Sequence, residues 1–238
     1  MRELDSIAVV GAGRLGTALT RLLDADGPFG RGHDGAGAAV VLLCVPDAAI
    51  AEAAALLAPG RLVGHCSGAT PLDPLAPHEA FSMHPLMSVT GPDTRFEGAA
   101  AAVEGSTARA LGVATALARA LGMAPVRVAP EDRALYHAAG ALTSNALVTV
   151  LGEAERLAGS LGLTRAQLAP IARAAVEQWA TLGAARALTG PVARGDDVTV
   201  MRQRDAIATR APALIPLWDA LVDRTRALAA RAREGATP

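Results

Sequence analysis

The chain has 238 residues, of which 51% are hydrophobic and 19% are charged, and its formal net charge is -1. This composition excludes a chain that is disordered over most of its length, and the length fits a nucleotide-binding domain with a smaller partner domain. The near-neutral charge and the aromatic content of 3% argue against nucleic-acid binding, which needs a basic surface and platforms for stacking bases.

The first predicted elements are an apolar strand at residues 7–10 and a helix at residues 15–23, joined by the glycine turn GAGRLG. This turn matches the G-x-G-x-x-G pattern, which binds a dinucleotide when it follows a strand and opens a helix. The free amides at the helix start would hold the diphosphate. The alternative is a purely structural turn. The predicted cofactor ligands here are Gly11, Ala12, Gly13, Arg14, Leu15 and Gly16.

The next stretch, DADGPFGRGHD at residues 24–34, lies where such a fold places its second strand. Pro28 and the neighbouring glycines break a strand pattern, so we expect this strand to be shortened or absent. Asp34 lies near the usual distance for an acidic residue that binds the ribose 2′-hydroxyl. Arg31 suits a 2′-phosphate instead, which favours NADP(H) over NAD(H). A solvated loop charge is the alternative for Arg31.

Alternating strands and helices follow, which predicts a parallel sheet with crossover helices. The expected strands are residues 38–46, 62–68, 80–85, 99–105 and 124–129, and the expected helices are residues 47–58 and 106–122. Ligands of open α/β sheets lie beyond the carboxyl ends of the strands, so the loops containing Val45, Pro46, Asp47 and Ser67 are predicted to face the cofactor. Asp47 is alternatively a helix N-cap. Two cysteines in apolar runs are expected to be reduced, and no metal site is predicted.

After Pro130 only helical patterns remain. A long helix is expected at residues 131–162, a second from Thr164 to about Leu182, a third capped by Asp196 or Asp197, and a last one at residues 212–231. The predicted fold is therefore α/β, with a Rossmann-like parallel-sheet domain at residues 1–129 and an all-α substrate or dimerisation domain at residues 130–238.

Two histidines are candidates for proton transfer. His84 comes before a proline at a strand end, where it could act as acid or base or serve as a structural residue. His137 and Ser144 lie two helical turns apart on one face of the long helix, with Asn145 beside them. This polar stripe either lines a cleft or faces solvent, and Tyr136 is expected on another face.

The motifs GAGRLG, LLCVPDAAI, GHCSGA, SMHPLMSV, YHAAGALTSNALVTVLGEAE and ALTGPVARGDDVTV together resemble the Rossmann-like oxidoreductases with a helical C-terminal domain of unknown function, the DUF2520 type. The resemblance covers most of the chain. It implies a helical second domain similar to those of pyrroline-5-carboxylate reductase and 6-phosphogluconate dehydrogenase, and it implies no particular substrate.

The segment HPLMSVT is also similar to the part of prephenate dehydrogenases in which a histidine before proline contacts the substrate hydroxyl. This similarity implies a catalytic role for His84 and, more weakly, for Ser67. Related reductases often use a lysine on the first helix of the second domain. The chain has no lysine, and His137 with Asn145 occupies the nearest equivalent stretch. Arg194, in the turn LTGPVARGDD, could bind a substrate carboxylate, and a plain structural turn is the alternative.

Two functions remain open from the sequence. The first is an oxidoreductase that moves hydride between NADP(H) and a small carbonyl, hydroxy-acid or imine substrate, with catalytic residues His84, His137, Asn145 and Ser67 and substrate ligands Ser144 and Arg194. The second is a non-catalytic dinucleotide-binding sensor with an eroded cofactor site. We expect a cytoplasmic homodimer that pairs through its helical domain and does not enter a membrane.

Overall fold

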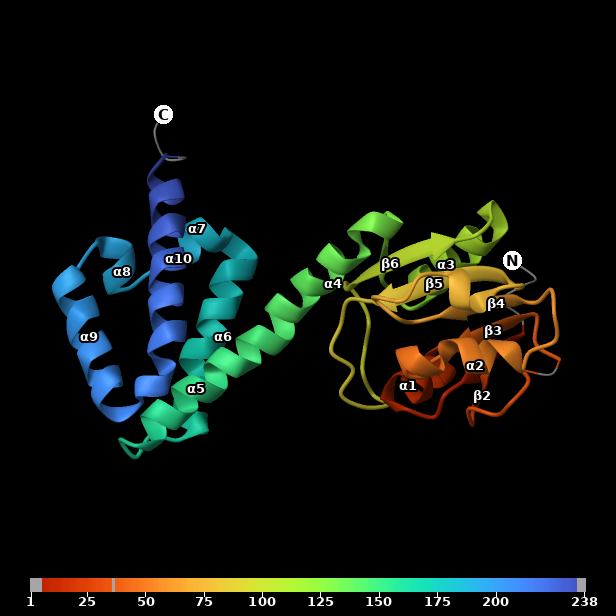
Figure 1. Cartoon of the computed structure of the whole chain (residues 1–238), viewed down its shortest axis with the longest axis horizontal. Helices are drawn as coiled ribbons and strands as arrows, with labels where there is room; N and C mark the ends of the chain where they lie inside the picture. The colour runs from red at the N-terminus through yellow and green to blue at the C-terminus, as the bar shows by residue number, and fades with distance from the viewer. Residues whose placement is uncertain (1–5, 36, 235–238) are drawn as a thin grey trace. The chain divides into compact units, whose positions relative to one another are not determined.

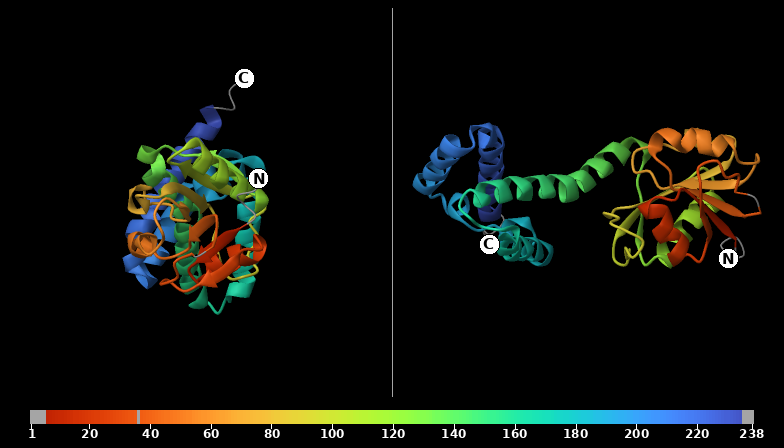
Figure 2. Two further views of the ribbon diagram at one scale, coloured as in Figure 1. Left: turned by 90° about the vertical axis from the view of Figure 1, so that its right-hand side faces the viewer. Right: turned by 90° about the horizontal axis from the view of Figure 1, so that it is seen from below.

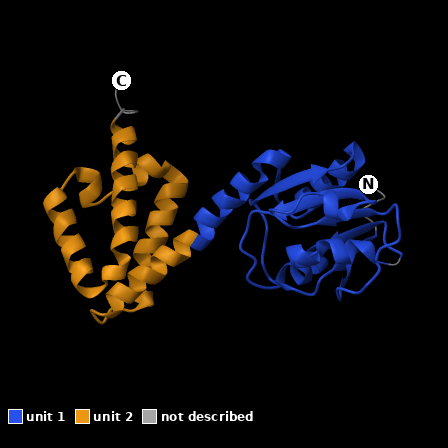
Figure 3. Cartoon of the chain, in the orientation of Figure 1, with its two compact units in different colours: residues 1–145 blue, residues 146–238 orange. Residues whose placement is uncertain are grey.

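The computed structural model describes residues 6–35 and 37–234 and contains two compact units, residues 1–145 and residues 146–238 (Figure 3). The first unit is built on a sheet, and the second consists of helices. This is the predicted α/β order of a Rossmann-like domain followed by helices. The predicted boundary near Pro130 and the boundary of the compact units differ in one helix, α4 (Arg133–Ala141), which the contacts assign to the first unit.

The described part of the first unit contains a seven-stranded sheet with the order β2-β1-β3-β4-β5-β6-β7 (Figure 1). The strands are β1 (Ile7–Val10), β2 (Asp26–Phe29), β3 (Val40–Leu43), β4 (Leu62–His65), β5 (Glu79–Pro85), β6 (Ala100–Gly105) and β7 (Ala124–Arg127). The chain leaves β1 toward β2 and returns to β3 on the other side of β1. Such a switch of direction opens a ligand crevice at the carboxyl ends of the two central strands.

Helices cover both faces of the sheet (Figure 2). α1 (Arg14–Leu22) and α3 (Ala108–Ala120) pack on one face, and α2 (Ile50–Ala55) packs on the other. All residues of β1 and β3 are buried. Burial on both faces explains why these two strands read as continuous apolar runs in the sequence.

β6 is the exception to the predicted parallel sheet. It pairs antiparallel with β5, while the other neighbouring pairs are parallel. The expectation of a wholly parallel sheet is therefore wrong at this strand. Residues 86–99 form no helix in the structure, and a chain that makes no crossover over the sheet returns antiparallel to the strand it left.

β2 is present, although it has only four residues, and it pairs in parallel with β1. The expectation that Pro28 breaks the strand is wrong, because β2 lies at the sheet edge, where a missing N–H costs no ladder hydrogen bond. A Cβ on Gly27 would lie 2.6 Å from the Val9 carbonyl oxygen, and the φ of this glycine is 114°. The strand therefore depends on a glycine at this position.

The predicted long helix consists of α4, a π-helical turn at Leu142–Ala146 and α5 (Leu147–Gly159). The stretch from Pro130 to Gly159 is long and apolar enough to cross a membrane, by length and composition alone. A single helix of this kind is weak evidence, because helices of soluble proteins pass the same test. It carries the polar residues His137, Ser144 and Asn145, and the absence of membrane insertion stays a prediction.

The second unit begins with α5 and continues through shorter and longer helices. These are α6 (Arg165–Leu182), α7 (Ala184–Ala187), α8 (Pro191–Arg194), α9 (Asp197–Arg210) and α10 (Ile215–Glu234). Thr164 caps α6 through a capping box with Gln167, and the Asp196 side chain accepts the Thr199 amide at the start of α9. These caps confirm the predicted starts of both helices and select Asp196 over Asp197.

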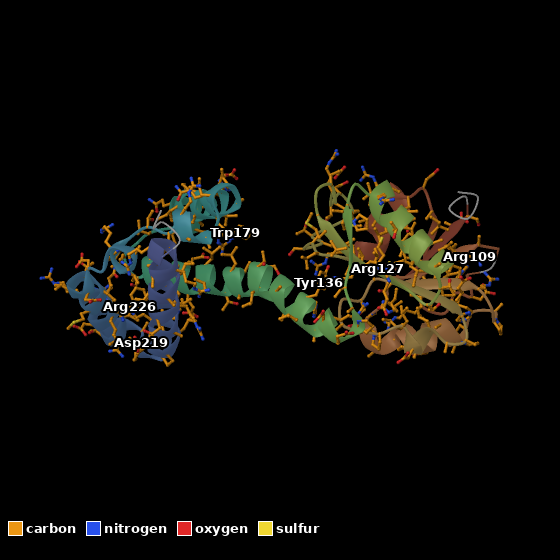
Figure 4. The ribbon with its side chains drawn as sticks, turned by 90° about the horizontal axis from the view of Figure 1, so that it is seen from above. Arg109, Arg127, Tyr136, Trp179, Asp219 and Arg226 are labelled. Atoms are coloured by element: carbon orange, nitrogen blue, oxygen red, sulfur yellow. The ribbon has the colours of Figure 1, made fainter. Side chains whose placement is uncertain are left out.

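The core of the second unit is small. Ile207, Ala211 and Leu214 form its buried centre. Ion pairs between Arg204 and Asp219 and between Arg226 and Asp197 join α9 to α10, where Figure 4 shows Asp219 and Arg226. α6 has no buried residue among those described. Its apolar side chains therefore remain on the surface of the single chain.

Candidate functional site

Each glycine of the turn after β1 has a separate structural reason. A Cβ on Gly11 would lie 2.2 Å from the Cys44 carbonyl oxygen, and one on Gly16 would lie 1.8 Å from the Gly11 carbonyl oxygen. A Cβ on Gly13 would meet nothing within 4 Å. Gly11 and Gly16 thus permit tight packing of β1, β3 and α1, whereas Gly13 leaves open space before the helix. No side chain caps α1, so its first amides are available to a diphosphate.

The loop after β3 adds Val45, Pro46 and Asp47 beside this turn. The Cys44 amide donates to the Val10 carbonyl oxygen at 2.7 Å, which places the loop at the carboxyl end of β1. Asp47 begins a short 3-10 turn whose N-cap position is occupied by Pro46. The alternative of Asp47 as the N-cap is therefore wrong. The Asp47 carboxylate partly offsets the lowering of the pKa of His84 and of His65, which burial dominates.

The segment after β2 is folded around a stack of two rings. The Phe29 and His33 rings are parallel with centroids 3.7 Å apart, and His33 Nδ1 accepts the Gly35 amide at 3.0 Å. Arg31 is exposed and lines a hollow of 220 Å³ with Gly32 and residues of α2, including Glu52. Asp34, the alternative ribose ligand, has a side chain that is 64% exposed. Arg31 and Asp34, the two candidate ligands of the ribose end of the cofactor, thus both lie on the segment that follows β2.

The loop after β4 is a rigid turn built by His65 and Ser67. His65 Nδ1 accepts the Ser67 amide at 3.2 Å, and its Nε2 lies 3.1 Å from the Pro71 carbonyl oxygen. Burial lowers the pKa of His65, which keeps the ring neutral for both contacts. Ser67 Oγ accepts the amides of Ala69 and Thr70 and contacts the Thr70 hydroxyl at 2.9 Å. The Ser67 hydroxyl is thus committed to its own turn.

Gly68, the next residue, lies between the two candidate histidines. A Cβ on Gly68 would be 2.9 Å from His84 Nε2, His84 Cε1 and His137 Cδ2. The two imidazoles are perpendicular, with centroids 5.8 Å apart. His137 therefore lies beside His84 rather than on an isolated solvent-facing stripe, although its side chain is exposed at the mouth of the site.

Tyr136 lies on α4, where Figure 4 labels it, and its hydroxyl orients His84. The Tyr136 hydroxyl donates to the His84 carbonyl oxygen at 3.2 Å and lies 3.2 Å from His84 Nδ1. The Tyr136 hydroxyl has one hydrogen, which it donates to the His84 carbonyl oxygen, so the Nδ1–H group of His84 donates to the Tyr136 hydroxyl oxygen. His84 Nε2 is then the unprotonated nitrogen beside Gly68. Tyr136 does not line the pocket with His137 and Ser144. It lies on the adjacent face of the helix, as expected, and this face also reaches His84.

Burial, together with the nearby His137 and Arg133, lowers the pKa of His84 to about 4. His84 is therefore neutral at pH 7 and presents a hydrogen-bond acceptor. Burial also raises the pKa of Tyr136, so the phenol keeps its proton. The arrangement can accept a proton from a substrate O–H or N–H group.

These side chains open into a pocket of 570 Å³ at the end of β5. Its lining includes His84, His137, Leu86, Met87, Ser144 and Asn145. Ser144 Oγ lies 2.8 Å from Asn145 Oδ1 and 3.0 Å from the Gly140 carbonyl oxygen. The pocket thus combines two imidazoles, a hydroxyl and an amide with an apolar wall, and no described arginine or carboxylate lines it.

Arg194 belongs to the second unit. It is the last residue of α8, between Gly190, with φ 95°, and Gly195 in the left-handed conformation. Hydrogen bonds from Thr199 lower the pKa of the nearby Asp196, and Arg194 contributes to this shift. The predicted turn is thus present with a short helix inside it. The carboxylate-binding role of Arg194 stays a prediction.

Arg133 is a further residue of the site that its own sequence context does not single out. Arg133, Tyr136, His137 and Gly140 follow the i, i+3, i+4, i+7 spacing of one helical face. This spacing was the available signal. The spacing alone does not identify Arg133 as a site residue, because an arginine at a helix start usually lies in solvent. In the structure Arg133 is only 4% exposed.

The fold and this site define a class of protein: a Rossmann-like sheet with a dinucleotide fingerprint and a pocket at its strand ends, followed by a helical unit. Within this class, the model of the family described as "Domain of unknown function (DUF2520)" matches residues 99–225, more than half of the chain. The chain belongs to this family, as the resemblance of its motifs predicts.

Solved structures with this fold cover nearly the whole chain. Protein TM1727 from Thermotoga maritima is 23% identical, with a TM-score of 0.80 over 95% of this chain and 99% of that chain. A reductive aminase from Aspergillus terreus, in complex with NADPH and ethyl levulinate, is 17% identical, with a TM-score of 0.66 over 92% of each chain.

Pyrroline carboxylate reductase from Plasmodium falciparum, with NADP bound, is 10% identical and has a TM-score of 0.59 over 94% of this chain and 98% of that chain. At these identities the likeness is one of fold. A comparison with curated protein sequences finds no significant match.

Proposed function

We propose that the protein is an NADP(H)-dependent oxidoreductase that moves hydride between the nicotinamide and a small carbonyl, hydroxy-acid or imine substrate. The observation that carries the proposal is the pair of imidazoles around Gly68. They stand at the end of β5 in a sheet whose β1 ends in the glycine turn. Two enzymes of the same fold, the reductive aminase and pyrroline carboxylate reductase, have NADPH or NADP bound.

The turn fits a dinucleotide because Gly13 leaves open space in front of amides that no side chain caps. Gly13, Arg14 and Leu15 would hold the diphosphate, with Gly11, Ala12 and Gly16 shaping the turn. Arg31 would bind the 2′-phosphate, and Val45, Pro46 and Asp47 would border the nicotinamide end. The bound cofactor would supply the hydride.

The residues of the chain would handle the proton. His84 Nε2 would accept the hydrogen of a substrate hydroxyl or amine during oxidation and return it during reduction. His137 is exposed and would exchange this proton with water. Ser144 and Asn145 would orient the substrate through hydrogen bonds. Ser67 would act through the shape of its turn rather than by direct contact, because its hydroxyl is already occupied.

A titration with NADPH and NADH, followed by nicotinamide fluorescence, tests the cofactor. Micromolar binding with preference for NADPH supports the proposal, and preference for NADH transfers the ribose contact to Asp34. Absence of binding to either nucleotide would mean that the cofactor site has been lost, and it would favour a non-catalytic protein that keeps only the fold. For turnover, His84→Ala and His137→Ala are each expected to reduce kcat by about 100-fold or more. A loss of much less than tenfold in both variants would remove these residues from the mechanism.

We also propose that the protein is a homodimer that pairs through its helical unit. α5 and α6 enclose an apolar groove of 730 Å³, the α5–α6 groove, whose lining includes Val148, Leu151, Leu168, Ile171 and Ala172. Ile171 is 72% exposed. Exposed apolar surface of this extent on one helix pair is typical of protein interfaces, and a second copy would cover it. A cytoplasmic location stays a prediction.

A further inference from the structure

Arg133 connects three separate segments of the first unit to the start of α4. Its Nη2 donates to the Ser67 carbonyl oxygen at 2.9 Å, and its Nη1 donates to Ser82 Oγ at 3.0 Å and to Glu104 Oε2 at 2.5 Å. Ser67 lies in the turn after β4, Ser82 lies on β5 and Glu104 lies on β6. One guanidinium thus fixes the helix, the turn and two strands relative to one another.

A buried arginine is expensive to maintain. Its desolvation commonly exceeds the gain from its ion pair, and an apolar residue of similar volume is often equally stabilising. Arg133 is 4% exposed and its Nε has no hydrogen-bond partner in the described structure. Stability alone therefore gives little reason for an arginine here, and its contacts point to a role in the site.

The contacts of Arg133 determine where the two imidazoles lie. Tyr136 and His137 follow Arg133 by three and four positions, so they share its helical face. The Ser67 carbonyl that Arg133 holds directly precedes Gly68, which lies against both rings. A shift of the turn or of the first helical turn of α4 would therefore separate His84 from His137.

We propose that Arg133 is a positioning residue that holds the Ser67–Gly68 turn and the inward face of α4 so that His84 and His137 converge on one point. This inference rests on the proposed function for the meaning of the site, but its main test needs no turnover. Neither Arg133 nor any of its three hydrogen-bond partners lines the pocket, so its effect is exerted through the histidines.

The charge of Arg133 supplies the readout. The charged and titratable groups that act on His84 are His137, Arg133 and His65, which lower its pKa, and Asp47, which raises it. Tyr136 contacts Nδ1 directly. Removal of this charge raises the pKa of His84 if Arg133 lies at its observed place, so Arg133→Met tests that place. The positioning role itself is tested by Arg133→Lys, which keeps the charge but loses the geometry of the contacts.

The experiment compares Arg133→Met, Arg133→Lys and Arg109→Met in the full chain by NMR titration of the histidine rings. Arg109 donates to Glu79 at 2.6 Å, so Arg109→Met removes an Arg–Glu ion pair of the same unit that is more exposed than that of Arg133. We expect Arg133→Met to raise the pKa of His84 by a few tenths of a pH unit, roughly the effect of one partly screened charge, and Arg133→Lys to raise it less. Arg109→Met should leave the pKa of His84 unchanged. Equal titration of His84 in wild type and Arg133→Met overturns the inference.

Arg133→Lys covers the case in which Arg133→Met does not fold. Lysine keeps the charge but cannot hold three acceptors in the same fork. We expect faster amide hydrogen exchange at residues 67–70 and a kcat reduced by about tenfold with little change in the KM for NADPH. Wild-type exchange in Arg133→Lys overturns the positioning role. If NADPH does not bind at all, the proposed function fails, while the titration and the exchange still decide the role of Arg133.

Discussion

The phenol oxygen of Tyr136 contacts both the side chain and the backbone of His84. It lies 3.2 Å from His84 Nδ1 and 3.2 Å from the His84 carbonyl oxygen. The two rings meet edge to face with centroids 5.6 Å apart. The phenol thereby selects the tautomer of His84 as well as its orientation, and the free nitrogen is the one beside Gly68.

Tyr136→Phe is expected to reduce turnover by about tenfold or more, because the unpaired Nδ1 no longer fixes the ring or its tautomer. Loss of the hydrogen bond should lower the free energy of unfolding by only about 1 kcal/mol. Steady-state kinetics of Tyr136→Phe, His84→Ala and the double variant test this. If the fold-reduction in kcat of the double variant equals the product of the two single fold-reductions, Tyr136 does not act through His84.

The stability of the protein is expected to fall in acid because of His84. Its pKa is about 4 in the folded chain and 6.5 ordinarily, so the unfolded chain binds the proton more readily. The stabilisation is full above pH 6.5 and is lost as the pH falls toward 4, by up to about 3 kcal/mol. Urea unfolding at pH 7 and pH 4.5 measures this change in the free energy of unfolding.

His84→Asn should lose less stability over this range. The lowered pKa of His65 should leave a residual loss in this variant. Identical losses in both proteins would contradict this.

Arg31 and Glu52 are expected to set the cofactor preference in opposite directions. Arg31→Ala should weaken NADPH binding by about tenfold or more and leave NADH binding unchanged, since only NADPH carries the 2′-phosphate. Glu52 lines the same hollow, so Glu52→Gln should strengthen NADPH binding by removing a like charge. Fluorescence titration measures both. Arg21→Ala, in the last turn of α1, is the control, and an equal loss there would remove the assignment from Arg31.

A charge in the α5–α6 groove is expected to dissociate the homodimer. Ile171→Glu would place a carboxylate in the apolar surface that the second copy should cover, and an unpaired buried charge is strongly unfavourable. Light scattering should give a monomer mass for this variant and a dimer mass for the wild type. Val126→Glu on β7 is the control, because Val126 is also exposed, at 45%, but lies in the first unit. A wild-type monomer at high concentration would end the proposal.

Local patterns in the sequence were sufficient for most elements. The apolar runs of β1 and β3, the glycine turn and the helix starts at Thr164 and Asp196 depend on residues close in sequence, and all are confirmed. The antiparallel direction of β6 and the formation of β2 despite Pro28 were not predictable in this way. They depend on the path of a connection and on a place at the sheet edge, which no short pattern encodes.

The site was predictable only where single residues carry chemistry. His84 and His137 were selected by residue type, and the structure brings them together around Gly68. Arg133 and Tyr136 were not selected, because their partners lie on segments distant in sequence. Ser82 and Glu104 become partners of Arg133 only when β5 and β6 pair, with Ser82 directly opposite Glu104.

The glycine between the two imidazoles also bears on inheritance. A glycine codon is one base change from an alanine codon, and the methyl group gained at Gly68 would stand 2.9 Å from His84 Nε2 and His137 Cδ2. That change would push the rings apart while every strand kept its neighbours. A single base change at this codon is therefore enough to displace the two rings in a chain that keeps its sheet.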